Sequence, residues 1–152
     1  MASNRHLGRI VALQTVYEYV FRADCEDSAN DLSEILERNI KRYSETIDDK
    51  DFIVELTNGV VNTREELDKE LQPLAPEWPL NQISRIDHAV LWIGLYELIN
   101  HSDVPPKVVI NEAVELAKGF GSDSSSKFIN GVLGTAYRNR SGDDASKEEK
   151  QA

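Results

Sequence analysis

Apolar residues recur at intervals of three and four along most of this chain, and this spacing restricts the fold more than any other feature. It is the spacing of one face of an α-helix, and the alternation typical of a strand is nowhere sustained. The pattern predicts helices over 4–22, 31–46 and 52–71. The third is expected to end before Pro73, because proline lacks an N–H and clashes with the preceding helical turn.

A proline-rich connector separates these helices from a second set. Three prolines fall within 73–79, which makes this the expected boundary between subdomains of about 1–72 and 80–140. Beyond the connector, Ser84 followed by Asp87 resembles a capping box. The pair predicts the start of a strongly apolar helix.

Two more helices are expected after that one, over KVVINEAVELAK and after the serine run at 124–126. The first is expected to end on a glycine with positive φ, a conformation typical of helix C-caps. The stretch 141–152 has no apolar residue beyond alanine and predicts a disordered charged tail. The sequence thus predicts an all-α fold of about seven helices that form a single domain over 1–140.

Charge and composition exclude several classes of function. The formal net charge of −10 has the wrong sign for general polyanion binding, so any nucleic-acid site must be a local patch. The single cysteine, Cys25, permits no internal disulfide, and no Cys or His spacing matches a zinc site. The stretch MASNRHLGRIVALQ has no unbroken apolar run of the kind a signal peptide needs, so we do not expect secretion. The most apolar stretch, AVLWIGLYELI, is shorter than the ~20 residues that span a bilayer. We expect a cytoplasmic protein that holds no metal.

No arrangement of residues in the sequence indicates catalysis. His6, His88 and His101 fall in different predicted elements, and the loop around Cys25 is acidic, which disfavours a thiolate. No serine has the frame of a nucleophile elbow. GFGSDS lacks both the preceding strand of a dinucleotide site and the GK[ST] ending of a P-loop. We expect a protein without enzymatic activity and without a cofactor.

The stretch GFGSDSSSKF, residues 119–128, has two interpretations. In the simpler one it ends one helix and caps the next, and Phe128 packs into the core. In the other, the N–H groups and positive dipole at the start of the last helix bind a phosphate beside Ser124 and Lys127. The ring of Phe128 then stacks on an unpaired RNA base. The residues alone favour the first interpretation without excluding the second.

A weak basic patch begins the chain. Arg5 and Arg9 lie four residues apart, hence on one face of the first helix, and His6 is adjacent. Two arginines and a mostly neutral histidine more often form a solvated helix end than a binding site. The patch alone therefore does not indicate RNA binding.

Several stretches resemble the NusB family of bacterial transcription antitermination factors. The most specific is HSDVPPKVVINEAVELAKGFGSDSSSKFINGVLG, 101–134, which is similar to the family's SDVP, a lysine, a run like INEAIELAK, a glycine loop and KFVNGVL. AVLWIGLYEL resembles the family helix that ends in LYEL, and ALQTVY is similar to AVQALY. The resemblance implies a NusB-like helical fold of two small packed bundles.

The resemblance also implies a function. The family binds the boxA RNA element together with the ribosomal protein NusE, and helps to assemble an antitermination complex with other Nus factors on RNA polymerase, notably for ribosomal RNA operons. Some members form homodimers that hide the RNA surface, so the oligomeric state stays open. Two alternatives remain. One is a non-enzymatic protein–protein interaction module without RNA binding of its own. The other is the similar domain at the front of some ribosomal RNA methyltransferases, which the length of this chain disfavours.

The family's functional residues transfer to three places in this chain. The amino-terminal RNA-binding segment falls on Arg5, His6 and Arg9, and the second RNA surface falls on Ser124, Lys127 and Phe128. The acidic contact to NusE falls on Asp87. The chain departs from the pattern at His6 and Leu7, where the family often has arginine, and at Ser124 and Ser126, where it has Asp and His. Fewer arginines imply fewer phosphate contacts and a flatter salt dependence.

Overall fold

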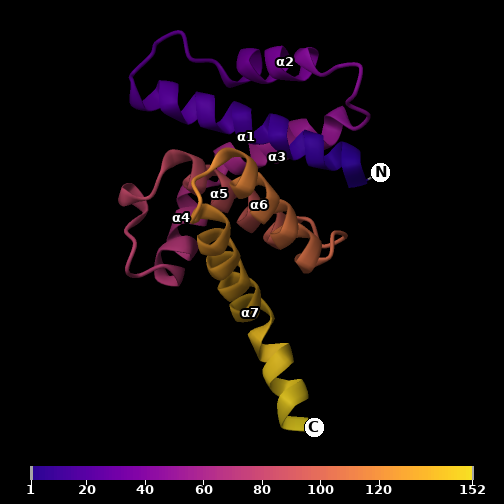
Figure 1. Ribbon diagram of the computed structural model, residues 1–152, viewed down its shortest axis with the longest axis vertical. Helices are drawn as coiled ribbons and strands as arrows, with labels where there is room; N and C mark the ends of the chain where they lie inside the picture. The colour runs from indigo at the N-terminus through magenta and orange to yellow at the C-terminus, as the bar shows by residue number, and fades with distance from the viewer. Residues whose placement is uncertain (1, 152) are drawn as a thin grey trace.

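The computed structural model describes the backbone of residues 2–151 and the side chains of residues 5–141. Within this range the chain is helical without strands (Figure 1). Of two 3₁₀ turns, Gln72–Leu74 overlaps the start of the connector and Leu80–Gln82 follows its end. The helices are α1 (Ala2–Asp24), α2 (Leu32–Arg42), α3 (Lys50–Asn62), α4 (Arg64–Leu71), α5 (Arg85–Asn100), α6 (Pro106–Phe120) and α7 (Ser125–Gln151). The predicted all-α class is confirmed.

Helix α5 is the centre of the molecule. Its residues 89–97 are all buried, including the carboxylate of Glu97. A helix that is apolar all round needs neighbours on every side, and α5 packs against α1, α3, α4, α6 and α7. Ser84 caps this helix as the sequence predicts, because its Oγ accepts a hydrogen bond from the backbone N–H of Asp87 at 3.1 Å.

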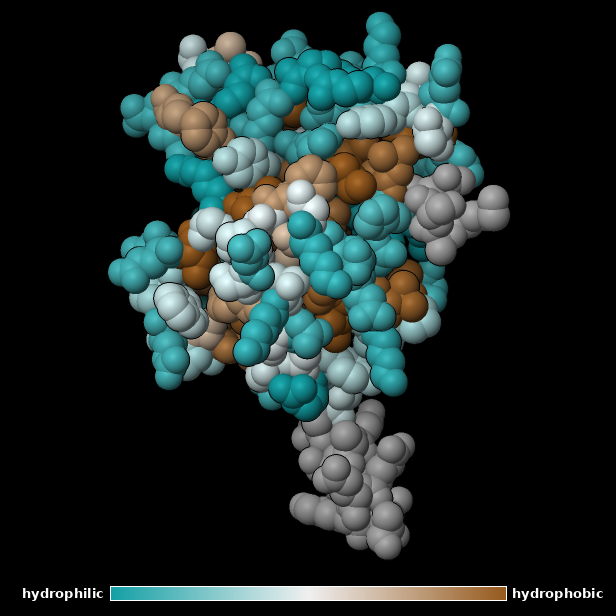
Figure 2. Space-filling model, in the orientation of Figure 1, coloured by the Kyte–Doolittle hydropathy of each residue, from teal (hydrophilic) through white to brown (hydrophobic). Residues whose placement is uncertain are grey.

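The helices form two groups that meet on α5. Helix α1 packs against α2 and α3, and in Figure 1 these lie above α4, α6 and α7. On the face drawn in Figure 2, hydrophobic residues reach the surface mainly along the seam between α1 and the helices beneath it. Within the described residues, none of the helices is both long and apolar enough to cross a membrane.

The predicted helix over 52–71 is divided in two, so this prediction is wrong. Thr63 has φ −116° and ψ 14°, outside the helical region, and it ends α3 and begins α4. Its Oγ1 donates to the carbonyl of Gly59 at 2.7 Å, which satisfies an acceptor at the end of α3. A threonine side chain competes in this way with the helical backbone pattern. Apolar spacing continues across the break and therefore did not reveal it.

The turn between α6 and α7 also differs from its prediction. Gly121 has φ −97°, so the predicted glycine with positive φ is wrong. The position requires glycine for lack of space instead. A Cβ atom at residue 121 would lie 2.5 Å from Oγ of Ser125 and 2.8 Å from the carbonyl oxygen of Ala117. The same Ser125 Oγ accepts a hydrogen bond from the backbone N–H of Ser122 at 2.9 Å. A tight, internally bonded turn therefore sets where α7 begins.

The end of the chain is only partly described. Helix α7 continues to Gln151, whereas the sequence predicts a disordered tail over 141–152. Side chains from 142 onward lie outside the described residues. The tail and the subdomain boundary at 73–79 stay predictions.

Candidate nucleic-acid interface

The basic patch predicted on α1 is surrounded by carboxylates. The side chain of Arg5 is 38% exposed and lies 3.7 Å from Asp49 and 4.0 Å from Asp103. Nδ1 of His6 lies 2.6 Å from Oε2 of Glu112 on α6. Exposed ion pairs of this kind contribute little and exchange readily with other ions. Arg5 and His6 remain reachable from solvent, but the patch has little excess positive charge.

Arg9 is buried rather than exposed. Its Nε and Nη2 atoms donate to the two carboxylate oxygens of Glu97 at 2.7 and 2.8 Å. The side chains of this pair are 3% and 1% exposed. This fork-shaped pair between α1 and α5 occupies the Nε–Nη2 edge of the guanidinium, and Nη1 lies 3.9 Å from Glu112. The predicted direct contact between Arg9 and RNA does not fit this position, because the side chain is 3% exposed and one edge of it is bound to Glu97.

A histidine extends this buried network towards α3. Nδ1 of His101 lies 3.1 Å from Glu97, and Nε2 lies 2.8 Å from Oε2 of Glu55. Because carboxylates only accept, both ring nitrogens act as donors, which requires the charged imidazolium. The hydrogen bond with Glu97 is the largest cause of a raised pKa for His101; burial opposes it, and Glu55 adds to it. Burial would raise the pKa of Glu97, but the hydrogen bonds from His101 and Arg9 outweigh it and leave this pKa lowered.

The residues predicted at the start of α7 meet in one open cavity of about 510 Å³. Ser124 and Lys127 are exposed, while Phe128 is half-buried and packs partly against the core. Both interpretations of Phe128 thus hold in part. Lys127 has no hydrogen bond or ion pair within the described residues. The cavity is lined by Trp78, Gln82, Ile83, Ser84, Asp87, Ser124, Lys127 and Phe128.

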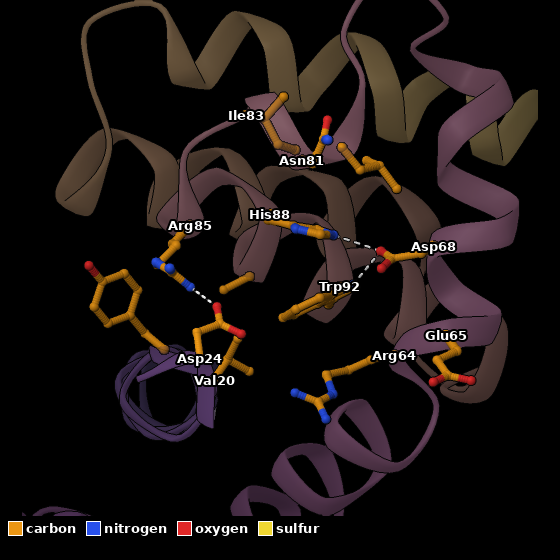
Figure 3. Close-up of a pocket in the computed structure, with 13 residues that line it drawn as sticks. Val20, Asp24, Arg64, Glu65, Asp68, Asn81, Ile83, Arg85, His88 and Trp92 are labelled. Atoms are coloured by element: carbon orange, nitrogen blue, oxygen red, sulfur yellow. Dashed lines mark hydrogen bonds and ion pairs between the residues drawn. The ribbon is translucent and has the colours of Figure 1, made fainter. Parts of the chain in front are cut away.

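A second hollow, of about 670 Å³, lies between α1, α4 and α5 (Figure 3). In it Oδ1 of Asp68 accepts from Nε1 of Trp92 at 2.7 Å and lies 2.6 Å from Nε2 of His88. Arg85 pairs with Asp24 on the α1 side. The hollow shares Ile83 with the cavity beside α7, so the two adjoin at the start of α5.

The structure therefore groups the predicted site residues in two places. Ser124, Lys127 and Phe128 share a cavity with Asp87, whereas Arg5, His6 and Arg9 line none of it. Helix α6 connects the two places. Glu112 on α6 contacts His6, and it lies eight residues before Phe120, the last residue of α6 before the turn to α7. At 1.5 Å per residue, this contact is about 12 Å along the helix from that turn.

Two features of this surface were not predicted. Trp78 projects from the connector with 57% of its surface exposed, and it lines the cavity with Phe128. The sequence PEWP could have indicated this exposure, because a tryptophan with prolines on both sides cannot lie within a core helix. The network around Glu97 had a signal too, since a carboxylate inside an apolar stretch requires a buried partner. Within the described residues, no group of three or more His, Cys, Asp or Glu side chains is arranged for a metal.

Comparison with known proteins agrees with this architecture. The NusB family profile matches residues 6–138. The transcription antitermination protein NusB of Dehalococcoides mccartyi (strain CBDB1) is 39% identical over 138 residues, covering 91% of this chain and 92% of the relative. NusB of Chloroflexus aggregans (strain MD-66 / DSM 9485) is 42% identical over 137 residues, covering 89% and 87%.

Solved structures give the same result for the fold. NusB of T. maritima superposes with a TM-score of 0.78 at 31% identity, covering 88% of this chain and 90% of that one. A structure of the antitermination factors NusB and NusE in complex with double-stranded RNA has the same TM-score of 0.78 at 21% identity, covering 91% and 99%. A match over most of the chain, in both sequence and fold, shows that this chain belongs to the NusB family.

Proposed function

We propose that this chain is a transcription antitermination factor that binds boxA-type RNA together with NusE. It then helps to assemble a complex with other Nus factors on RNA polymerase, notably for ribosomal RNA operons. The proposed role is assembly, not catalysis. The observation that supports it most is the cavity at the start of α7, in a chain of the NusB family. There a lysine without a partner among the described residues meets a half-buried aromatic ring and the exposed hydroxyl of Ser124.

The RNA surface of this proposal begins at that cavity. Lys127 offers a free positive charge, and Ser124 offers a hydroxyl at the start of a long helix, whose dipole favours a phosphate. Phe128 offers a ring face to an unpaired base. From there the RNA follows α6 to Arg5 and His6. Arg9 acts on RNA only through the fold, as a positioning residue that fixes α1 on α5.

The NusE surface of the proposal lies beside it, at the start of α5. Asp87 stands at its edge, and the adjoining hollow adds Glu65, while Asp24 and Asp68 there are already bonded to Arg85, and to His88 and Trp92. The net charge of −10 attracts a basic partner and raises its association rate. One structure that shares this fold contains NusE and double-stranded RNA with NusB.

The test is fluorescence anisotropy of a labelled boxA RNA titrated with this protein, with and without NusE, against a scrambled RNA at two salt concentrations. We expect selective binding that NusE strengthens. Phe128→Leu, which keeps apolar packing but removes the ring, is expected to weaken RNA binding by about 1–3 kcal/mol. Tyr137→Leu is the matched control, because Tyr137 is 39% exposed on the same helix outside the cavity. Equal affinity for both RNAs in the presence of NusE would refute the proposal.

A protein-only interaction module is the second candidate. The pairing of Arg5, His6 and Arg9 with carboxylates favours it, since it reduces the positive charge available to RNA. In that case NusE binds, RNA adds nothing, and the salt response reflects the protein partner alone. A homodimer would hide the RNA surface, so the oligomeric state is measured by sedimentation before either titration.

A further inference from the structure

The cavity beside the start of α7 contains groups that the proposed function does not explain. Its volume of about 510 Å³ is within the range of pockets that hold small ligands. Trp78 has the largest exposed fraction, 57%, among the exposed large hydrophobic residues in the described part of the chain. Its ring and that of Phe128 reach one cavity from segments fifty positions apart. Two aromatic rings beside a lysine are suited to a flat ligand that has a phosphate attached.

Asp87 adds an unused acceptor to this cavity. Its Oδ1 is buried and makes no hydrogen bond within the described residues. The helix cap does not use this side chain, because the cap bond runs from the backbone N–H of Asp87 to Ser84. A buried carboxylate oxygen without a donor is unfavourable. Only Oδ1 is buried, so a donor that enters the cavity can reach the carboxylate at its other oxygen, Oδ2.

Resting on the RNA binding proposed above, we propose that this cavity holds one unpaired guanine of the bound RNA. Trp78 and Phe128 stack on the base, Lys127 contacts the adjoining phosphate, and Asp87 accepts hydrogen bonds from the Watson–Crick edge. Asp87 offers its accessible oxygen to the base, while its other oxygen, Oδ1, stays buried.

The donor pattern of the bases selects guanine. Guanine presents two neighbouring donors, N1–H and N2–H₂, which can both donate to one carboxylate oxygen. Adenine and cytosine present one amino group beside a ring nitrogen that accepts, and uracil presents one N–H between two carbonyl oxygens. An acceptor placed against a carboxylate is repelled, so these three bases bind less well.

The experiment measures base preference on the full chain by anisotropy. The probe is a labelled oligouridine of about 12 nucleotides, within the ~4–16 that a single-strand site covers. One central uridine is replaced by guanosine, inosine, adenosine or cytidine. We expect the guanosine probe to bind about tenfold more tightly than oligouridine, with inosine between them because it lacks the N2 amino group.

Two variants test the residues assigned to the base. Asp87→Asn is expected to abolish the preference for guanosine while retaining affinity for oligouridine, and Asp51→Asn, an equal charge change on α3 outside the cavity, is expected to retain the preference. Trp78→Ala is expected to weaken binding of the guanosine probe about tenfold, and Trp78→Phe much less, since the ring remains. Thermal unfolding checks that each variant is folded.

The outcomes separate this inference from the function on which it rests. RNA binding that depends on Lys127 but shows no preference for guanosine, or a preference that survives Asp87→Asn, overturns the guanine site alone. Loss of NusE binding in Asp87→Asn and Trp78→Ala with the base preference unchanged assigns the cavity to the protein partner and also overturns it. Failure of the wild-type protein to bind any RNA, with NusE present, overturns both proposals.

Discussion

The two regions that the sequence marks for RNA differ in how their polar groups are used by the fold. On α1, Arg5, His6 and Arg9 each have at least one carboxylate within 4.0 Å. At the start of α7, Lys127 has no partner and Asp87 has a buried oxygen without one, within the described residues. The buried pair of Arg9 contributes to stability, whereas the exposed pairs of Arg5 and His6 contribute little but compete with a ligand for these cations. We therefore expect the region richer in arginine to contribute less to RNA binding than the cavity beside α7.

Among the changes that test this comparison, breaking the pair between Arg9 and Glu97 is expected to have the largest effect, which is a loss of folding stability. Arg9→Ala leaves the Glu97 carboxylate charged at 1% exposure, and such a change costs about 3–5 kcal/mol. The free energy of unfolding from urea titrations measures it. Arg5→Ala is the matched control on the same helix and is expected to change stability by less than about 1 kcal/mol, because its ion pairs are exposed.

The same pair of variants tests the role of Arg9 in binding. If Arg9→Ala kept full stability and lost RNA affinity, the guanidinium would contact RNA directly, against the burial described above. Replacing both partners, Arg9→Met with Glu97→Leu, is expected to recover part of the lost stability, because the buried carboxylate and guanidinium are removed together and His101 keeps Glu55 as its partner.

Alanine substitutions at two glycines near the second region are expected to change stability by smaller amounts, and in opposite directions from each other. Gly121→Ala places a Cβ 2.5 Å from Ser125 Oγ, at the turn that positions α7, and is expected to cost about 1–3 kcal/mol. Gly119→Ala meets no atom within 4 Å in helix α6 and is expected to stabilise by about 0.5–1 kcal/mol. Thermal unfolding of the two variants measures both. Equal effects would mean that the turn is not tightly packed.

The fold was largely predictable because burial follows apolar spacing. Val11, Ile53 and Leu95 are buried in the helices that their spacing predicts. The break at Thr63 was not predictable in this way, because the Thr63 hydroxyl bonds to the carbonyl of Gly59 while apolar spacing continues. The role of Gly121 was missed for a related reason, since close approach to Ser125 depends on how two helices meet.

The site was less predictable than the fold. The grouping of Ser124, Lys127 and Phe128 follows from their closeness in sequence, but their meeting with Trp78 depends on a connector folding back on α7. The burial of Arg9 depends on Glu97, 88 residues away, and no local pattern on α1 indicates it. Residues with long-range partners are those for which sequence reasoning alone was insufficient.

The buried network of the first region also predicts a pH dependence of stability. The pKa of His101 is raised in the folded protein above its ordinary value of 6.5, so the folded state binds more protons than the unfolded state above that pH. Its stabilisation is complete below about pH 6.5 and is lost as pH rises through the folded pKa. We expect the free energy of unfolding to fall over this range, and to fall less in His101→Gln. Glu97 has a lowered pKa, so its contribution is lost only at acid pH, outside this window.

The smallest expected effect is on the salt dependence of RNA binding. It is measured by removing Lys127, which has no partner among the described residues, and Arg5, which is paired. Lys127→Ala removes an unpaired charge, and is expected to reduce the slope of log K against log salt by about 0.7 in titrations of single-stranded RNA. Arg5→Ala is expected to reduce it less, because Asp49 and Asp103 lie within 4.0 Å and compete with a phosphate for the guanidinium. Asp49→Asn then becomes informative, since removing a competing carboxylate should steepen the slope and strengthen binding through Arg5. If the arginine variant flattened the slope as much as the lysine variant, its ion pairs would be dissociated in the RNA complex, and the α1 region would be as available to RNA as the α7 region.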